Sequence, residues 1–129
     1  MRKPVLLIVD DEPEIGEFAT FSAENVGYAV ISTITGEQFQ QAYLAHSPDL
    51  ILMDVAMPDI DAVGLLEWLY DAANQTPIIL MSGYGDYMLT WAHTQAKDMG
   101  MTIIDTWSKP FSLQELEKVL LDNLAKFAA

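Results

Sequence analysis

The apolar residues of the chain follow two patterns, and segments of the two kinds alternate along the sequence. The first kind is a short run of aliphatic and β-branched residues bounded by polar or turn residues, which is typical of strands buried on both faces of a parallel sheet. The pattern therefore predicts five strands. They are Val5–Val9, Tyr28–Ile31, Leu50–Met53, Ile78–Met81 and Thr102–Ile104.

The second kind of segment lies between these runs and carries apolar residues at helical spacing. Apolar side chains recur every three or four residues over 15–26, which places them on one face of a helix. Pro13 suits a first helical turn, Asp61 and Ser112 are placed as N-caps, and Gly100 is placed as a helix stop. Further stripes of this kind cover 39–46, 63–73, 88–99 and 113–127.

The order of the predicted elements is strand then helix, five times over. Such alternation is typical of an α/β fold in which a doubly wound parallel sheet lies between two layers of helices, with right-handed crossovers. With 129 residues and neither a linker nor a repeat, the chain is expected to form one domain over residues 1–129.

Charge and composition narrow the classes of partner. Six Lys and Arg residues face nineteen Asp and Glu residues, so the net charge is −13 and the sequence pI is near 4.1. A chain this acidic repels phosphate backbones and anionic lipid, which argues against direct contact with nucleic acid or a membrane and favours basic proteins and multivalent cations.

The chain has no cysteine, which excludes disulfides, thiolate metal sites and cysteine nucleophiles. Its apolar runs are too short to span a bilayer or form a signal peptide, so we expect a cytoplasmic location.

Polar residues follow four of the predicted strands at the point where each strand ends. The first strand leads into an acidic triplet that begins with Asp10 and Asp11, the third ends at Asp54, the fourth at Ser82, and the fifth leads to Lys109. In open parallel sheets, ligands bind beyond the carboxyl ends of the strands. We therefore expect these side chains to meet at one edge of the sheet.

The chemistry of this set points to a cation and a phosphoryl group. Bringing two carboxylates close together costs about 4 kcal/mol at an effective dielectric near 20, and a bound cation relieves that repulsion. Oxygen ligands without His or Cys suit Mg²⁺. A carboxylate nucleophile, a lysine and a hydroxyl donor complete the parts needed for phosphoryl transfer to an aspartate.

At these residues the chain resembles the receiver domain of two-component response regulators, over essentially its whole length. The matching motifs are Val9–Pro13, Asp54–Pro58, Ser82–Gly83 and Lys109–Phe111, in this order and each at a strand end. The resemblance implies a flavodoxin-like fold with strand order 2-1-3-4-5. It also implies a phosphoacceptor that assists its own phosphorylation and dephosphorylation rather than an enzyme.

The resemblance also implies a role for each matched residue near the acidic triplet. Asp54 would accept a phosphoryl group from a phosphohistidine. Asp11 would bind Mg²⁺ (or Mn²⁺) directly and Asp10 mainly through water, and the backbone carbonyl of Ala56 would be a further ligand.

On the opposite side of the expected site, Ser82 and Lys109 would each contact a phosphoryl oxygen. Pro110 would fix the turn that aims the lysine, through a cis peptide bond. Phosphorylation adds roughly −1.5 to −2 charges at one point, which would move the loops that carry these residues and change the surface of the following helix. The implied partners are a sensor histidine kinase or phosphotransfer protein, an output domain or downstream protein, and a second copy of the chain through the fourth helix, fifth strand and fifth helix.

The chain departs from the usual receiver pattern at a position three residues before the lysine. Receivers usually carry Tyr or Phe there, whereas this chain has Thr106 with Trp107 beside it. Strand alternation places these two residues on opposite faces, so Trp107 is a doubtful substitute for the usual aromatic switch. The segments Ser82–Tyr84 and Ser108–Ser112 are similar to receivers fused to cyclic-di-GMP phosphodiesterase (EAL) domains.

Three other functions compete with that of a phosphorylated receiver. A degenerate receiver would bind partners without phosphorylation, but all the acidic and lysine positions are present. A metal-dependent phosphatase with an aspartyl nucleophile would need a second acid just after Asp54, where Val55 and Ala56 stand. A nucleotide-binding flavodoxin-like protein would need a phosphate cradle in the first loop, which is acidic here and repels anions.

Overall fold

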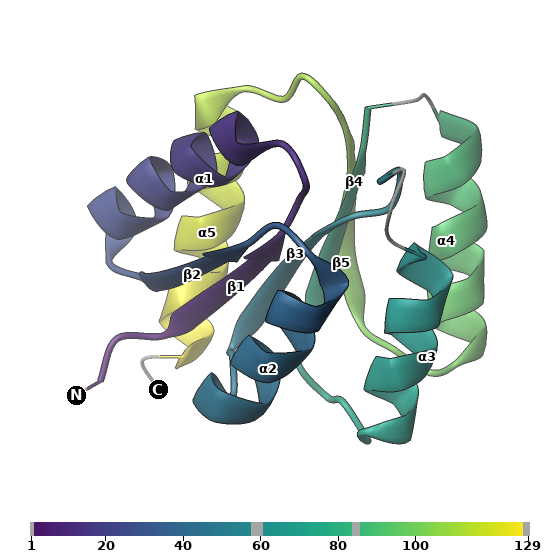
Figure 1. Ribbon diagram of the computed structural model, residues 1–129. Coiled ribbons are helices and arrows are strands. Elements are labelled where there is room, and N and C mark those ends of the chain that lie inside the picture. Colours follow the sequence, from purple (N-terminus) through teal and green to yellow (C-terminus); the bar gives the residue numbers. More distant parts are fainter. Residues whose placement is uncertain (1, 58–60, 84–85, 128–129) are drawn as a thin grey trace.

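The computed structural model describes residues 2–57, 61–83 and 86–127. Strands and helices alternate along the chain, and the carboxyl end of each strand leads into the next helix (Figure 1). The elements are β1 (Val5–Val9), α1 (Pro13–Val26), β2 (Ala29–Thr33), α2 (Gly36–His46), β3 (Leu50–Asp54), α3 (Ala62–Asp71), β4 (Ile78–Ser82), α4 (Asp86–Asp98), β5 (Ile103–Ser108) and α5 (Leu113–Phe127).

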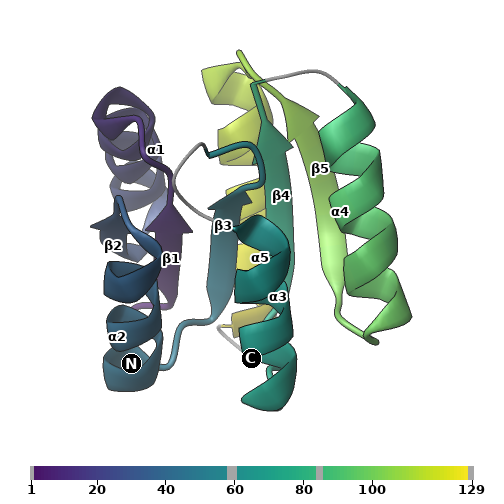
Figure 2. The ribbon, with the colours of Figure 1, turned by 45° about the vertical axis from the view of Figure 1, so that its right-hand side comes forward.

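The five strands form one parallel sheet in the order β2-β1-β3-β4-β5. The order reverses between β1 and β3, so the loops after these two strands leave the sheet side by side. Figure 2 shows all the arrowheads at the same end of the sheet. The predicted doubly wound α/β fold with strand order 2-1-3-4-5 is confirmed.

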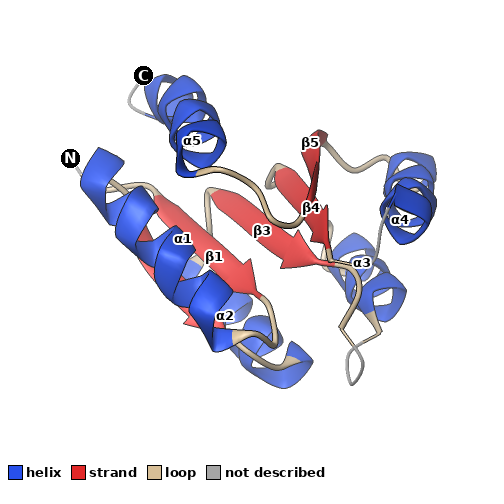
Figure 3. Ribbon diagram, turned by 90° about the horizontal axis from the view of Figure 1, so that it is seen from above, coloured by secondary structure: helices blue, strands red, loops and turns tan. Residues whose placement is uncertain are grey.

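Helices cover both faces of the sheet and enclose two apolar layers. Helices α1 and α5 lie on one face, and α2, α3 and α4 lie on the other (Figure 3). One layer includes Leu6, Ala19 and Leu116, and the other includes Leu7, Phe39 and Leu66. The odd and even residues of β1 therefore belong to different layers, as the two-residue period of a strand requires.

The three central strands match their predictions closely, whereas the two edge strands differ. β3 and β4 are buried at every position, as expected for strands covered on both faces. The prediction of burial on both faces is wrong for β2 and β5, because most of their residues are half-buried or exposed. An edge strand has a neighbour on one side only. β5 also continues to Ser108, four residues beyond its predicted end, through the polar residues that follow its apolar run.

The helix-end signals are largely confirmed. Pro13 begins α1, Gly100 follows α4 with a φ of 77°, and the Ser112 hydroxyl accepts the N–H of Glu115 at 3.0 Å. Asp61 holds the N-cap position of α3, but among the described residues its side chain makes no capping hydrogen bond. Within the described residues, none of the helices combines the length and the apolar character that a membrane span requires.

Candidate functional site

The carboxyl ends of four strands bring the predicted polar residues to one edge of the sheet. Asp10 directly follows β1, Asp54 ends β3, Ser82 ends β4, and Lys109 directly follows β5. Asp10, Asp54 and Ser82 are buried, with 1%, 2% and 0% of their surface exposed. Buried polar side chains at the end of an apolar sheet are costly unless they have partners or bind a ligand. The prediction that these side chains meet at one edge of the sheet is confirmed by their positions at the strand ends.

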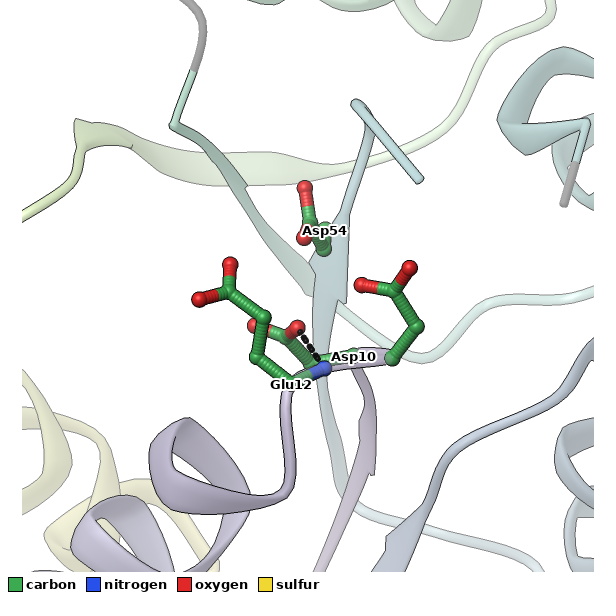
Figure 4. Close-up of side chains that lie close together, drawn as sticks. Asp10, Glu12 and Asp54 are labelled. Atoms are coloured by element: carbon green, nitrogen blue, oxygen red, sulfur yellow. Dashed lines mark hydrogen bonds between the residues drawn. The ribbon is translucent and has the colours of Figure 1, made fainter. Parts of the chain in front are cut away.

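Four carboxylates gather at the centre of this edge. Asp10, Asp11, Glu12 and Asp54 each place a carboxylate oxygen within 4.8 Å of the others. In Figure 4, Asp54 approaches from β3 while Asp10 and Glu12 approach from the end of β1. Two backbone groups orient the buried acids: the N–H of Glu12 donates to Asp10 Oδ1, and the N–H of Ala56 donates to Asp54 Oδ1, each at 2.9 Å.

A single ammonium group contacts three of these carboxylates. Lys109 Nζ lies 2.6 Å from Asp10 Oδ2, 2.9 Å from Asp54 Oδ2 and 3.0 Å from Glu12 Oε1. The contacts with Asp54 and Glu12 are hydrogen bonds, whereas the contact with Asp10 is an ion pair without hydrogen-bond geometry. The lysine side chain is only 7% exposed. Its charge therefore acts in a poorly hydrated place, where electrostatic interactions are stronger than at the surface.

Burial and charge shift the pKa values of two of these groups. Burial raises the pKa of the Asp10 carboxyl to about 6, against the opposing effects of Lys109 and of the Glu12 N–H. Burial alone would lower the pKa of Lys109, but its contacts with Asp10, Asp54 and Glu12 raise that pKa above its ordinary value. The ammonium therefore stays charged, while one carboxylate is held at an electrostatic cost.

The donor set fits a hard divalent cation. Every side chain in the acidic cluster offers oxygen ligands, which suit Mg²⁺ rather than a soft metal. Asp10 Oδ2 is buried and lies 2.6 Å from Lys109 Nζ, and because a carboxylate oxygen can serve more than one partner, it could also be a ligand of the cation. Two expected features remain predictions: ligation by the Ala56 carbonyl, and direct ligation by Asp11.

The loop after β5 is fixed to the end of β4. The backbone N–H of Lys109 donates to the Ser82 carbonyl at 2.8 Å, and the Lys109–Pro110 peptide bond is cis, as predicted. Ser82 and Ser108 are paired positions in the parallel register of the two strands. Ser82 and Lys109 are thus held side by side at the site. The matching motif residue Pro58 and the neighbour Tyr84 lie outside the described residues.

Thr106 and Trp107 lie on opposite faces of the sheet, as strand alternation predicts. Trp107 is buried in the layer under α1 and α5, where its ring lies 5.1 Å from that of Phe111. Thr106 is half-buried and lines a cavity of about 310 Å³ together with Leu89 and His93 of α4. Trp107 therefore does not occupy the α4 side of the sheet, where Thr106 leaves space.

Glu12 is the one residue of the acidic cluster for which the sequence predicts no role of its own. It belongs to the acidic triplet after β1, yet its carboxylate accepts a hydrogen bond from Lys109, which follows β5. The only signal in the sequence was its position directly after two acids at a strand end. The reach of a long side chain across a loop does not follow from that position.

Comparisons with known proteins agree with this arrangement. The family model described as response regulator receiver domain matches residues 6–121. The probable transcriptional regulator ycf27 of Cyanidium caldarium is 32% identical over 116 residues, which cover 90% of this chain and 44% of the relative. The transcriptional regulatory protein KdpE of Mycobacterium tuberculosis (strain H37Rv) is 31% identical, with 86% and 46% covered. The chain thus spans less than half the length of these relatives.

Solved structures show the same fold. A response regulator receiver domain protein (CheY-like) from Methanospirillum hungatei JF-1 superposes with a TM-score of 0.82 at 22% identity, covering 97% of this chain and 96% of that one. A response regulator from Colwellia psychrerythraea gives a TM-score of 0.82 at 25% identity, with 97% and 99% covered. Because the family model spans nearly the whole sheet and all four strand ends, the chain belongs to the response regulator receiver domain family of two-component signalling.

Proposed function

We propose that the chain is a phosphorylation-switched receiver in which Asp54 accepts one phosphoryl group from a phosphohistidine of a sensor histidine kinase or phosphotransfer protein. The observation that carries this proposal is the environment of Asp54. Its carboxylate is buried at the end of β3, with one oxygen fixed by the Ala56 N–H and the other 2.9 Å from Lys109 Nζ. A carboxylate aimed in this way is suited to act as a nucleophile toward phosphorus.

The transfer forms one bond and breaks one. A carboxylate oxygen of Asp54 bonds to phosphorus while the bond from phosphorus to the donor histidine nitrogen breaks. The nitrogen leaves with the electron pair, and because the other ring nitrogen of the phosphohistidine carries a proton, the histidine returns to neutral imidazole. Lys109 places a positive charge at the acceptor carboxylate, where it offsets the negative charge that gathers on the phosphoryl oxygens.

Asp10, Asp11, Asp54 and the backbone carbonyl of Ala56 would hold Mg²⁺ or Mn²⁺. When bound, the ion would supply the positive charge that lets an anionic donor approach the four carboxylates. Asp54 would bind the ion and also accept the phosphoryl group. Asp10 would contribute a negative charge to the metal site from a buried position.

The switch would run through the residues at the ends of β4 and β5. A phosphoryl group on Asp54 adds three strong acceptors beside Ser82 and Lys109, which are already linked to each other through the backbone. Movement of Ser82 toward the phosphoryl group would alter the loop into α4. Because Thr106 is small, the cavity between α4 and β5 would change shape without an aromatic side chain moving into it.

The expected partners follow from the family and the charge. Two relatives are described as transcriptional regulators and are more than twice as long as the matched region, so an output domain or downstream protein would read the switch. Tyr87 and Trp91 are exposed on α4, and a second copy could pack on the surface of α4, β5 and α5. A cytoplasmic location and the similarity to EAL-linked receivers stay predictions.

Intact mass after incubation with Mg²⁺ and acetyl phosphate tests the acceptor. We expect the native chain to gain one phosphoryl group, the Asp54→Asn variant to gain none, and chelation of the metal beforehand to prevent the gain. Asp98→Asn is the matched control, because Asp98 ends α4 at an exposed position and carries the same change of charge. Phosphorylation of the Asp54→Asn variant at the native level would refute the assignment.

A phosphorylation-independent receiver is the competing function. It would be favoured if the native chain gained no phosphoryl group from acetyl phosphate or a phosphohistidine donor while still binding Mg²⁺. Thr106, which stands where receivers usually carry Tyr or Phe, is the feature that favours this alternative, whereas the presence of Asp10, Asp11, Asp54 and Lys109 at the matched positions weighs against it.

A further inference from the structure

Lys109 has three carboxylate partners, and they differ in their exposure to water. The side chains of Asp10 and Asp54 are 0% and 2% exposed, whereas the side chain of Glu12 is 57% exposed. Removing a lysine from a buried carboxylate leaves an unpaired buried charge, which is strongly unfavourable. Removing it from an exposed carboxylate costs little, because water replaces the lost contact. Glu12 is therefore the partner that Lys109 can give up most easily.

The backbone of Glu12 is fixed while its carboxylate is available. Its N–H donates to Asp10 Oδ1 at 2.9 Å, and its carbonyl accepts the N–H of Ile15 at 3.1 Å. Glu12 occupies the N-cap position of α1, yet within the described residues its side chain makes no capping hydrogen bond. The carboxylate turns instead toward the sheet edge, where its Oε1 accepts a hydrogen bond from Lys109 Nζ at 3.0 Å.

A phosphoryl group on Asp54 would compete with Glu12 for the same ammonium. Lys109 has three N–H donors, and three carboxylates already surround it. Phosphorylation converts the Asp54 carboxylate into a neutral acyl group and places anionic phosphoryl oxygens beside Lys109. These oxygens then compete with Glu12, the most exposed partner, for the ammonium. We propose that Glu12 is a positioning residue that holds Lys109 in the unphosphorylated state and releases it when Asp54 is modified. This inference rests on the proposed function.

Glu12 would then slow the phosphorylation of Asp54 by small anionic donors. Its charge repels the donor, and its contact keeps Lys109 from the incoming phosphoryl oxygens. Glu12→Gln removes the charge and weakens the contact while keeping the length of the side chain. In the reaction with acetyl phosphate, the Asp54 oxygen bonds to phosphorus, and acetate leaves with the electron pair of the broken phosphorus–oxygen bond. We expect the variant to react about three- to tenfold faster at low ionic strength, as a charge change a few ångströms from the reacting group implies.

The matched control is Glu14→Gln. Glu14 lies two residues further on, in the first turn of α1, is exposed and carries the same charge. A general effect of net charge would accelerate both variants alike. A positioning effect would accelerate Glu12→Gln and leave Glu14→Gln near the native rate. The shorter variant Glu12→Asp keeps the charge but reaches less far, and it should fall between native and Glu12→Gln.

The experiment follows phosphoryl incorporation by intact mass for the native chain and these variants, at saturating Mg²⁺ and at low and high ionic strength. The advantage of Glu12→Gln should shrink at high ionic strength, because salt screens an exposed charge, whereas a loss of packing would not respond to salt. A rate for Glu12→Gln at or below the native rate, or an equal gain in Glu14→Gln, overturns the role of Glu12. If the native chain itself gains no phosphoryl group, the proposed function fails, and that outcome is distinct from the first.

Discussion

Asp10 carries a charge that the fold holds at a cost. Burial raises its pKa to about 6, which means that the surroundings disfavour the ionised carboxylate even with Lys109 2.6 Å away. We expect Asp10→Asn to raise the free energy of unfolding by about 1–2 kcal/mol near neutral pH without divalent cations, allowing for water at the open edge of the site. Urea denaturation of native and variant protein, with EDTA present, measures the difference.

The same shift predicts how stability depends on pH. The ordinary pKa of an Asp side chain is 3.8, so between about pH 4 and pH 6 the folded protein binds more protons at Asp10 than the unfolded chain does. Asp10 therefore makes a contribution to stability that is full below this window and is lost as the pH rises through 6. The advantage of Asp10→Asn should grow over the same interval. An advantage that is equal at pH 4.5 and pH 7.5 would contradict the assigned cause.

Lys109 should have opposite effects on folding and on metal binding. Lys109→Met removes the ammonium that contacts three carboxylates, and without divalent cations we expect a loss of about 2–3 kcal/mol in the free energy of unfolding. The same change removes a positive charge beside the acidic cluster, so the affinity for Mg²⁺ should rise. Calorimetric titration with Mg²⁺ and urea denaturation test the two halves. A variant that loses both stability and Mg²⁺ affinity would indicate general disruption of the site.

The identity of most site residues could be predicted from the chain, because strand ends are visible in the pattern. Three of them, Asp10, Asp54 and Ser82, stand directly after an apolar run, and Lys109 stands after the polar residues that follow the last run. Parallel strands bring these ends together. The distances could not be predicted. That Lys109 contacts three carboxylates, and that Glu12 is one of them, depends on loop paths and side-chain reach that no spacing rule contains.

At the scale of elements, the N-cap residues of α2 and α3 can be compared directly, because only one of the two side chains makes a capping hydrogen bond among the described residues. Thr35 caps α2 with its hydroxyl oxygen, which accepts the N–H of Gln38 at 3.1 Å, whereas Asp61 at the start of α3 makes no such bond among the described residues. We expect Thr35→Ala to lower the free energy of unfolding by about 1 kcal/mol. Asp61→Ala should lower it by about 0.3 kcal/mol or less, through the helix dipole alone. Equal losses in urea denaturation would show that the two caps do not differ.

The accuracy of the element predictions follows the burial of each element. β1, β3 and β4 are covered on both faces and flanked by strands, so their apolar runs coincide with their bounds to within one residue. β5 has α4 against one face and solvent at one edge, and its polar residues Asp105 and Ser108 still pair with β4. Hydrogen bonds to a neighbouring strand extend an edge strand past its apolar run, and composition does not report them.

At the scale of the whole molecule, a net charge of −13 and the acidic site act on stability in different ways. Repulsion among surface carboxylates is spread over the molecule and is screened by any salt. The repulsion among Asp10, Asp11, Glu12 and Asp54 is local, and a bound divalent ion relieves it directly. NaCl and MgCl₂ at equal ionic strength should therefore stabilise the protein to different extents.

We expect MgCl₂ at about a hundredfold excess over its dissociation constant to add about 2.7 kcal/mol of stability, or about 10 °C in Tm, beyond NaCl of the same ionic strength. Asp11→Asn should lose most of this extra stabilisation, because Asp11 is a proposed ligand, and should keep the response to NaCl. A surface control such as Asp98→Asn should keep both responses. Equal stabilisation of the native chain by the two salts would mean that the four carboxylates are tolerated by screening alone, and a Mg²⁺-dependent receiver would then lose its physical basis.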